Sequence, residues 1–79
     1  MIPLHPLKSS NLRAYGYQPD PGDAKTGLLA IQFHDGRTFM YAGVPETVFE
    51  AFLLSDSRGS FFHRSIKDVY RCIRPEEIQ

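Results

Sequence analysis

The sequence has a single cysteine, no net charge and no long hydrophobic run near its start. Cys72 has no partner for an internal disulfide, so we expect a protein of a reducing compartment, the cytoplasm. Nine basic residues balance nine acidic ones, so no overall field directs the molecule to nucleic acid or to an anionic membrane. Residues 1–8 contain no apolar run long enough for a secretory signal or a membrane span, and we expect neither.

Recognisable catalytic and metal-binding motifs are also missing. His5, His34 and His63 are far apart in the chain, and no cysteine or serine is arranged with them as a nucleophile. The histidines and Cys72 show none of the short paired spacings that structural zinc sites use. We therefore expect no enzyme activity, no cofactor and no metal, and we expect His63 to make a local hydrogen bond.

What the chain does contain is enough apolar material for one small core. Its 79 residues are 42% hydrophobic and include six phenylalanines and four tyrosines. A chain this short buries only about 60% of its unfolded surface, so a partner or a homo-oligomer is plausible from size alone. We expect an extended N-terminal arm over residues 1–8, one domain over residues 9–74 and a C-terminal tail over residues 75–79.

A β-hairpin is the strongest local signal. Two apolar runs, residues 28–33 and 38–42, flank Asp35-Gly36, a dipeptide that suits a two-residue type I′ turn. Such a turn pairs Ile31 with Met40 and places both on the core face. The opposite face then carries Phe39 and Tyr41, so this face is either covered by another element or open as an aromatic surface.

A strand is also predicted upstream, over residues 10–17. Its alternation places Leu12, Ala14 and Gly16 on one side and Arg13, Tyr15 and Tyr17 on the other. The proline- and glycine-rich residues 19–23 that follow predict a surface loop.

Two helices are expected in the second half. Pro45 suits the first turn of a helix that ends by Leu54, and its apolar stripe contains Val48, Phe49, Phe52 and Leu53. The residues from Asp56 to Ser60 turn the chain and cap a second, short helix anchored by Phe61, Phe62 and Ile66. Residues 69–74 form either a final strand or an extended segment.

Together these elements predict an α+β fold: a three- to four-stranded antiparallel sheet with a central β-hairpin, packed by one main helix and a second short helix. The predicted core consists of Leu29, Ile31, Phe33, Met40, Val48, Phe49, Phe52, Phe62 and Ile66.

The same residues resemble the pattern of the KTSC domain family. The resemblance runs from about Ser9 to Arg74 and rests on Ser9-Ser10-Asn11, Gly16-Tyr17, Phe39-Met40-Tyr41, Val44-Pro45, Ser57-Arg58-Gly59, Phe61-Phe62-His63, Ile66 and Tyr70. It implies a domain found at the C-terminus of some lysyl-tRNA synthetases and in small free-standing bacterial and phage proteins. Phe39 and His63 depart from the pattern, at positions where a tyrosine and an asparagine are expected. RNA binding is implied only by association with the synthetase.

A local excess of basic residues gives the implied RNA binding some physical support. Residues 57–74 carry five cations against one carboxylate, a net charge of plus four: Arg58, Arg64, Lys67, Arg71 and Arg74 against Asp68. Cations can hold the phosphates of single-stranded RNA while its bases stack on aromatic rings. The candidate RNA- or nucleotide-binding residues are Tyr15, Tyr17, Phe39, Tyr41, Arg58, His63, Arg64, Lys67 and Arg71.

Each of these features also has a structural explanation. Phe39 and Tyr41 can pack beneath the second helix, and the charges can form an ordinary solvated face. The Ser57–Ser60 turn can bind a phosphate, but helix capping explains it with fewer assumptions. The alternative function is a protein–protein interaction module that binds no nucleic acid.

Overall fold

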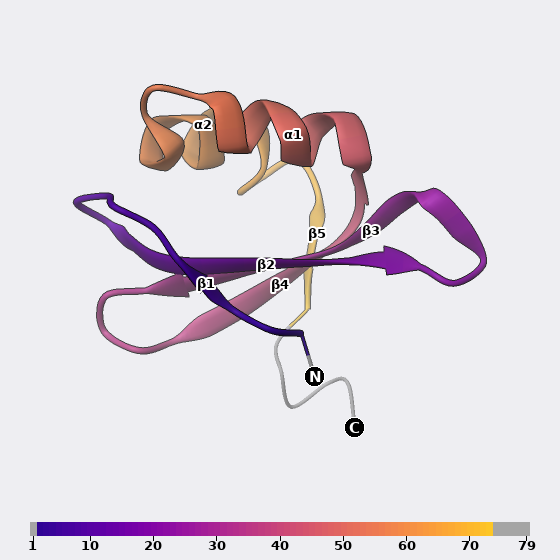
Figure 1. The fold of residues 1–79 in the computed structure, drawn as a ribbon, viewed down its shortest axis with the longest axis horizontal. Helices are drawn as coiled ribbons and strands as arrows, with labels where there is room; N and C mark the ends of the chain where they lie inside the picture. The colour runs from indigo at the N-terminus through magenta and orange to yellow at the C-terminus, as the bar shows by residue number, and fades with distance from the viewer. Residues whose placement is uncertain (1, 74–79) are drawn as a thin grey trace.

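The computed structural model describes residues 2–73 and shows a five-stranded antiparallel sheet with two helices on one face (Figure 1). The elements are β1 (His5–Pro6), β2 (Leu12–Asp20), β3 (Asp23–Phe33), β4 (Thr38–Pro45), α1 (Glu46–Leu54), α2 (Arg58–Ser65) and β5 (Arg71–Ile73). The strands follow one another in the order β1-β2-β3-β4-β5. The predicted α+β class is confirmed, with five strands rather than three or four. Arg74 and the predicted tail, residues 75–79, lie outside the described residues.

The predicted N-terminal arm is extended and adds a short edge strand to the sheet. His5 pairs with Tyr15, and Pro6 pairs with Ala14. Before β1, the chain crosses the face of the sheet away from the helices, over Gly16. A Cβ at Gly16 would collide with the backbone oxygen of Pro3, so the missing side chain makes this crossing possible.

The turn between β3 and β4 has three loop residues, not two. The Gly36 N–H donates to the Phe33 carbonyl and the Phe33 N–H donates to the Arg37 carbonyl, each at 2.9 Å. Gly36 has a φ of 92°, which a residue with a side chain rarely adopts. This arrangement is a type I turn followed by a left-handed glycine, the usual three-residue hairpin loop.

The longer loop shifts the predicted register by one residue. Ile31 pairs with Phe39 and Leu29 pairs with Tyr41, whereas Met40 pairs with Ala30. Because side chains alternate between faces, the shift moves Phe39, Met40 and Tyr41 to the opposite face from the one predicted. The prediction that Met40 belongs to the core is wrong, and so is the prediction that Phe39 and Tyr41 lie opposite the core.

A bulge in β2 changes one further prediction. The register shifts between Leu12, which pairs with Phe33, and Ala14, which pairs with Gln32. The extra residue, Arg13, reverses the alternation, so Leu12 joins the buried cluster on the helix side instead of sharing a face with Ala14. Downstream, β2 continues to Asp20 and β3 begins at Asp23, so the prediction of a loop over residues 19–23 is wrong except for the tight turn at Pro21 and Gly22.

Both helices have the predicted positions. α1 begins directly after Pro45 and ends at Leu54. The Ser57 side chain caps α2 by accepting a hydrogen bond from the Ser60 N–H at 3.3 Å, which confirms the capping interpretation of this turn. Within residues 2–73, no helix is long and apolar enough to cross a membrane.

The core lies between the helices and the sheet face that β2, β3 and β4 present to them. Its buried members are Leu12, Leu29, Ile31, Tyr41, Val44, Phe52, Phe62 and Ile66. Five of these residues were predicted, and the predicted Phe33, Val48 and Phe49 pack against the cluster while partly exposed. Leu12, Tyr41 and Val44 were not predicted, because strand register and bulges decide their orientation.

Phe52 is the residue through which α1 contributes most to this core. Its side chain is fully buried, whereas Leu54 at the end of the same helix is 85% exposed. We expect Phe52→Ala to lower the free energy of unfolding by about 3–5 kcal/mol, since it removes a phenyl ring and leaves a cavity. Leu54→Ala, the control, should change stability by less than about 0.5 kcal/mol. Chemical denaturation measures both, and equal effects would contradict this description of the core.

Candidate functional site

The predicted aromatic platform lies under the helices and not on an open face. Tyr41 is only 4% exposed, and its ring meets the Phe62 ring edge-on at 5.4 Å. Tyr17 stacks on Phe49, with the ring centroids 4.4 Å apart, and its hydroxyl donates to the Val44 carbonyl at 2.8 Å. These contacts confirm the alternative that Tyr41 packs beneath the second helix. Tyr41 is therefore not free to stack on a base, and one face of the half-buried Tyr17 ring is covered by Phe49.

The two remaining aromatic candidates, Phe39 and Tyr15, differ in their surroundings. Phe39 is partly buried and makes an edge-on contact with Phe33, with their ring centroids 5.7 Å apart. Tyr15 is half-buried against Phe49 and Phe52, yet one side of it reaches the surface beside His5. Tyr15 also lines a surface hollow.

The predicted basic residues and His63 are mostly at the surface. His63, Arg64 and Lys67 are exposed on or just after α2, and Arg71 is exposed on β5. Arg58 differs from them because it is half-buried at the start of α2. Arg74, the last cation of the predicted basic segment, lies outside the described residues.

A polar hollow lies where the start of the chain meets the first turn of α2. Its volume is about 170 Å³, and residues 8–11 form one wall while residues 56–60 form the other. The lining side chains carry two cations, one carboxylate and several hydroxyl and amide groups: Lys8, Ser9, Ser10, Asn11, Asp56, Ser57, Arg58 and Ser60. The structure thus brings the Ser-Ser-Asn and Ser-Arg-Gly segments together across more than 40 residues of sequence.

Hydrogen bonds shape the first wall of the hollow, and a glycine lets the second wall approach it closely. The Ser9 Oγ accepts from the Asn11 and Leu12 backbone N–H groups at 3.3 and 3.2 Å. Gly59 is buried against this turn, and a Cβ there would lie 3.3 Å from the Ser9 Oγ. The His34 Nε2 lies 2.8 Å from the Ser9 carbonyl oxygen, which can only accept, so Nε2 carries a proton and donates.

Arg58 is held in place from one side only. One terminal nitrogen, Nη2, donates to the Leu53 carbonyl at 2.9 Å, which fixes the guanidinium against the end of α1. Its Nε is buried and has no hydrogen-bond partner among the described residues. A buried donor without a partner is unfavourable by about 1–3 kcal/mol, so a ligand oxygen or a water that reached Nε would relieve this cost.

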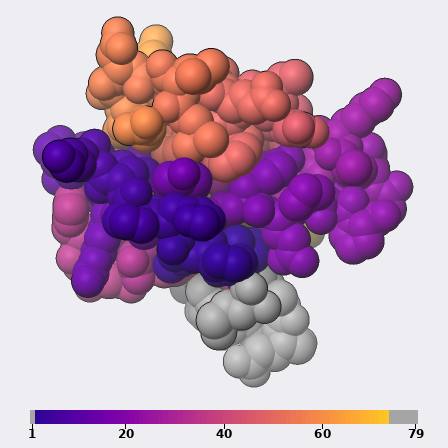
Figure 2. Space-filling view, in the orientation of Figure 1, coloured from indigo at the N-terminus to yellow at the C-terminus, as the bar shows by residue number. Residues whose placement is uncertain are grey.

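A second, more open hollow adjoins the first. Its volume is about 430 Å³, and it is lined by Pro6, Leu7, Lys8, Tyr15 and Arg58. Lys8 and Arg58 therefore line both hollows. We call the two together the Lys8–Arg58 groove. Figure 2 shows the indigo N-terminal part of the chain lying below the orange helical layer.

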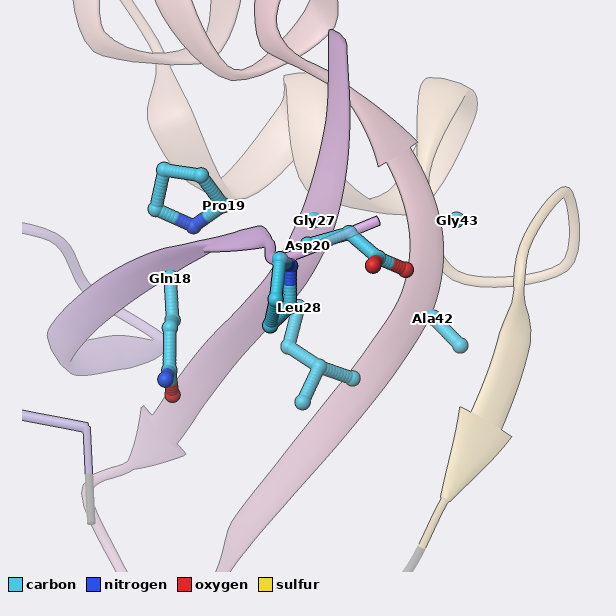
Figure 3. A pocket seen from close by; sticks show the side chains of 8 residues that line it. Gln18, Pro19, Asp20, Gly27, Leu28, Ala42 and Gly43 are labelled. Carbon is cyan, nitrogen blue, oxygen red and sulfur yellow. The ribbon is translucent and has the colours of Figure 1, made fainter. Parts of the chain in front are cut away.

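A third hollow, on the far hairpin, has different chemistry. It is about 150 Å³ in volume and is lined by Gln18, Pro19, Asp20, Pro21, Gly27, Leu28, Ala42 and Gly43. Figure 3 shows Leu28 and Ala42 beside Asp20, the only charged side chain among these lining residues. Without a cation, this hollow offers an anionic ligand no attraction.

The sequence predicted part of the groove and missed the rest. Arg58 and Tyr15 were candidates, but Lys8 and residues 9–11 were not. No periodic pattern connects residues 8–11 to residues 56–60, and the only hint was that both segments belong to the family pattern. Within residues 2–73, no three His, Cys, Asp or Glu side chains come together as metal ligands would.

Comparisons with known proteins agree on one family. The model of the KTSC domain matches residues 8–70. A protein of Tsukamurella paurometabola is 34% identical over 70 residues, which cover 89% of this chain and 97% of that protein. A lysine–tRNA ligase of Nostoc sp. is 33% identical over 70 residues, which cover 89% of this chain and 12% of the ligase. The crystal structure of a KTSC domain protein from Yersinia pestis superposes with a TM-score of 0.81 at 34% identity, covering 94% of this chain and 97% of that one.

Because Tyr41 is buried, the stability of the folded protein should decrease at alkaline pH. Burial, followed by the neighbouring Cys72 thiol, raises the pKa of Tyr41 well above its ordinary value. The folded protein therefore binds the phenolic proton more tightly than the unfolded chain does. This contribution to stability is complete below the unfolded-state pKa of about 10 and decreases as the pH rises above it.

We expect Tyr41→Phe to weaken this pH dependence, because phenylalanine does not ionise. The thermal midpoints of the two proteins, measured between about pH 8 and 11, should differ in slope above about pH 10. A wild-type midpoint that falls no faster than that of the variant would contradict the buried, protonated state of Tyr41.

Proposed function

Because the chain belongs to the KTSC domain family, we propose that it is a non-catalytic module that binds RNA or another nucleotide-bearing ligand in the Lys8–Arg58 groove. The observation that carries the proposal is that two adjoining hollows share the same two cations, Lys8 and Arg58. The lysine–tRNA ligase among the relatives supports it by association.

The two hollows match the two halves of a nucleotide. The polar hollow offers cations, hydroxyls and the Asn11 amide, groups that bind phosphate oxygens. The open hollow has apolar walls at Pro6 and Leu7 and an aromatic ring at Tyr15, groups that contact a base or sugar. Lys8 and Arg58 lie at the junction between them, where the phosphate of a bound nucleotide attracts both cations.

Exposed basic residues extend the positive surface beyond the groove. The first turn of α2 lines the polar hollow, and Arg64 and Lys67 follow along or just past the same helix, with the polar His63 ring beside them. Arg71 adds a further exposed cation on β5. In the proposal these residues attract the phosphates of nucleotides on either side of the one in the groove.

The alternative, a protein–protein interaction module, would use exposed apolar side chains. Leu54 and Val69 are 85% and 60% exposed, at the end of α1 and between α2 and β5. Exposed apolar side chains of this size favour a protein contact when they lie in one patch. Salt separates the two functions, since binding through phosphates weakens steeply as salt rises and an apolar contact does not.

The test is a titration of the protein with mixed-sequence single-stranded RNA at low and moderate salt. Lys8→Ala should weaken binding and reduce the slope of log K against log salt by about 1, because it removes one phosphate contact. Lys25→Ala is the matched control, since Lys25 is also an exposed lysine, on β3, but lines neither hollow of the groove. Fluorescence anisotropy measures the affinities.

Two results would contradict the proposal. The first is no detectable binding to RNA at low salt, which would favour the interaction module. The second is an equal loss of affinity in Lys8→Ala and Lys25→Ala, which would show that binding depends on net charge and not on the groove.

A further inference from the structure

We propose that His34 is a positioning residue for the Lys8–Arg58 groove, because it holds the wall of residues 8–11 in the conformation that receives a phosphate. This inference rests on the proposed function and deepens it, since it names a residue outside both hollows on which binding in the groove depends. It starts from the separation of 2.8 Å between the His34 Nε2 and the Ser9 carbonyl oxygen.

The wall is a short loop between two residues that pack in the core. Leu7 packs against the buried cluster and Leu12 belongs to it, so the four residues between them connect two fixed points. The Ser9 Oγ accepts hydrogen bonds from N–H groups two and three residues further along the chain. These bonds shape the wall, but they do not attach it to the rest of the molecule.

His34 supplies an attachment from outside the loop. It lies directly after β3, at the start of the turn to β4, and 25 residues from Ser9 in the sequence. Among the side-chain hydrogen bonds of residues 2–73, this is the one that joins residues 8–11 to a distant part of the chain. Gly59 also lies close to the Ser9 Oγ, but it has no side chain with which to bond.

The bond to Ser9 also sets the direction of the next backbone N–H. In a planar trans peptide, the Ser10 N–H points opposite to the Ser9 carbonyl, so it is directed away from His34. Ser10 lines the polar hollow, and its N–H has no hydrogen-bond partner within residues 2–73. A free backbone donor on this wall suits a phosphate oxygen.

Without the His34 bond, the wall leaves this conformation more often. When a site is correctly formed for only part of the time, its apparent affinity falls in proportion to that fraction. The number of phosphate contacts in the bound state stays the same, so the salt dependence of binding does not change. Loss of a positioning residue therefore differs from Lys8→Ala, which removes a phosphate contact.

The experiment compares His34→Gln with His34→Asn. The glutamine amide nitrogen reaches about as far from the backbone as Nε2 and can donate to the Ser9 carbonyl, whereas the asparagine amide is one methylene shorter. Both side chains are neutral, so their comparison contains no change of charge. We expect His34→Gln to bind mixed-sequence single-stranded RNA as the wild type does. His34→Asn should bind it about twofold to fivefold more weakly, with the same slope of log K against log salt.

A second measurement needs no ligand. The Asn11 and Leu12 N–H groups donate to the Ser9 Oγ, so their exchange with solvent reports opening of the wall. Measured by NMR on the free protein, both amides should exchange about twofold to fivefold faster in His34→Asn than in His34→Gln. The Lys25 N–H, which donates to the Asp23 Oδ1 at 3.1 Å, is the control and should exchange equally in both variants.

The outcomes separate this inference from the proposed function. Equal exchange at Asn11 and Leu12 in the two variants would overturn the inference. Equal RNA affinities of the two variants would also overturn it, while RNA binding in the groove still stood. A salt slope reduced by about 1 in His34→Asn would show that His34 contributes a phosphate contact itself and does not act through the wall. If the wild type and both variants fail to bind RNA, the proposed function is wrong, and the exchange rates still decide whether His34 holds the wall in place.

Discussion

The conformation of the Asp35-Gly36 turn decides which face of the sheet becomes the core. Gly36 adopts a positive φ and Asp35 does not, so the β3–β4 connection is a three-residue loop and not a type I′ turn, which needs a positive φ at both central residues. That single additional residue places Phe39 and Tyr41 on the same face as Ile31 and Leu29. The apolar stripe of α1 and the ring of Phe62 then have a buried aromatic surface to pack against, and the rest of the molecule is arranged around this contact.

Features that depend only on residues close to one another in the sequence were predictable. The bounds of α1 follow from Pro45 and from an apolar stripe that ends by Leu54, and the cap of α2 follows from Ser57. The register of the hairpin was not predictable in this way. Asp35-Gly36 fits both a two-residue and a three-residue loop. The difference of one residue in loop length decides on which face of the sheet the β4 side chains next to the turn lie.

The site was predictable only in part for a related reason. Cations such as Arg64 and Lys67 were recognisable as a local excess of charge, and they lie at the surface. Lys8 is a single cation in a proline-containing arm, and nothing in the sequence places it beside Arg58. The contact arises from the crossing of the N-terminal segment past α2, which depends on the β2 register and on the missing side chain of Gly59.

The meander order of the strands has a kinetic consequence. Each strand pairs only with its neighbours along the chain, so most of the sheet forms through contacts that are short in sequence and quick to close. The Lys8–Arg58 groove differs because its two walls are far apart in the sequence. Residues 8–11 meet residues 56–60 only after the helices have docked on the sheet. β1 has two residues and a single pairing partner, so this N-terminal segment can detach while the meander stays folded. A ligand held by both walls therefore slows that local opening, and amide hydrogen exchange in residues 5–12 reports its occupancy directly.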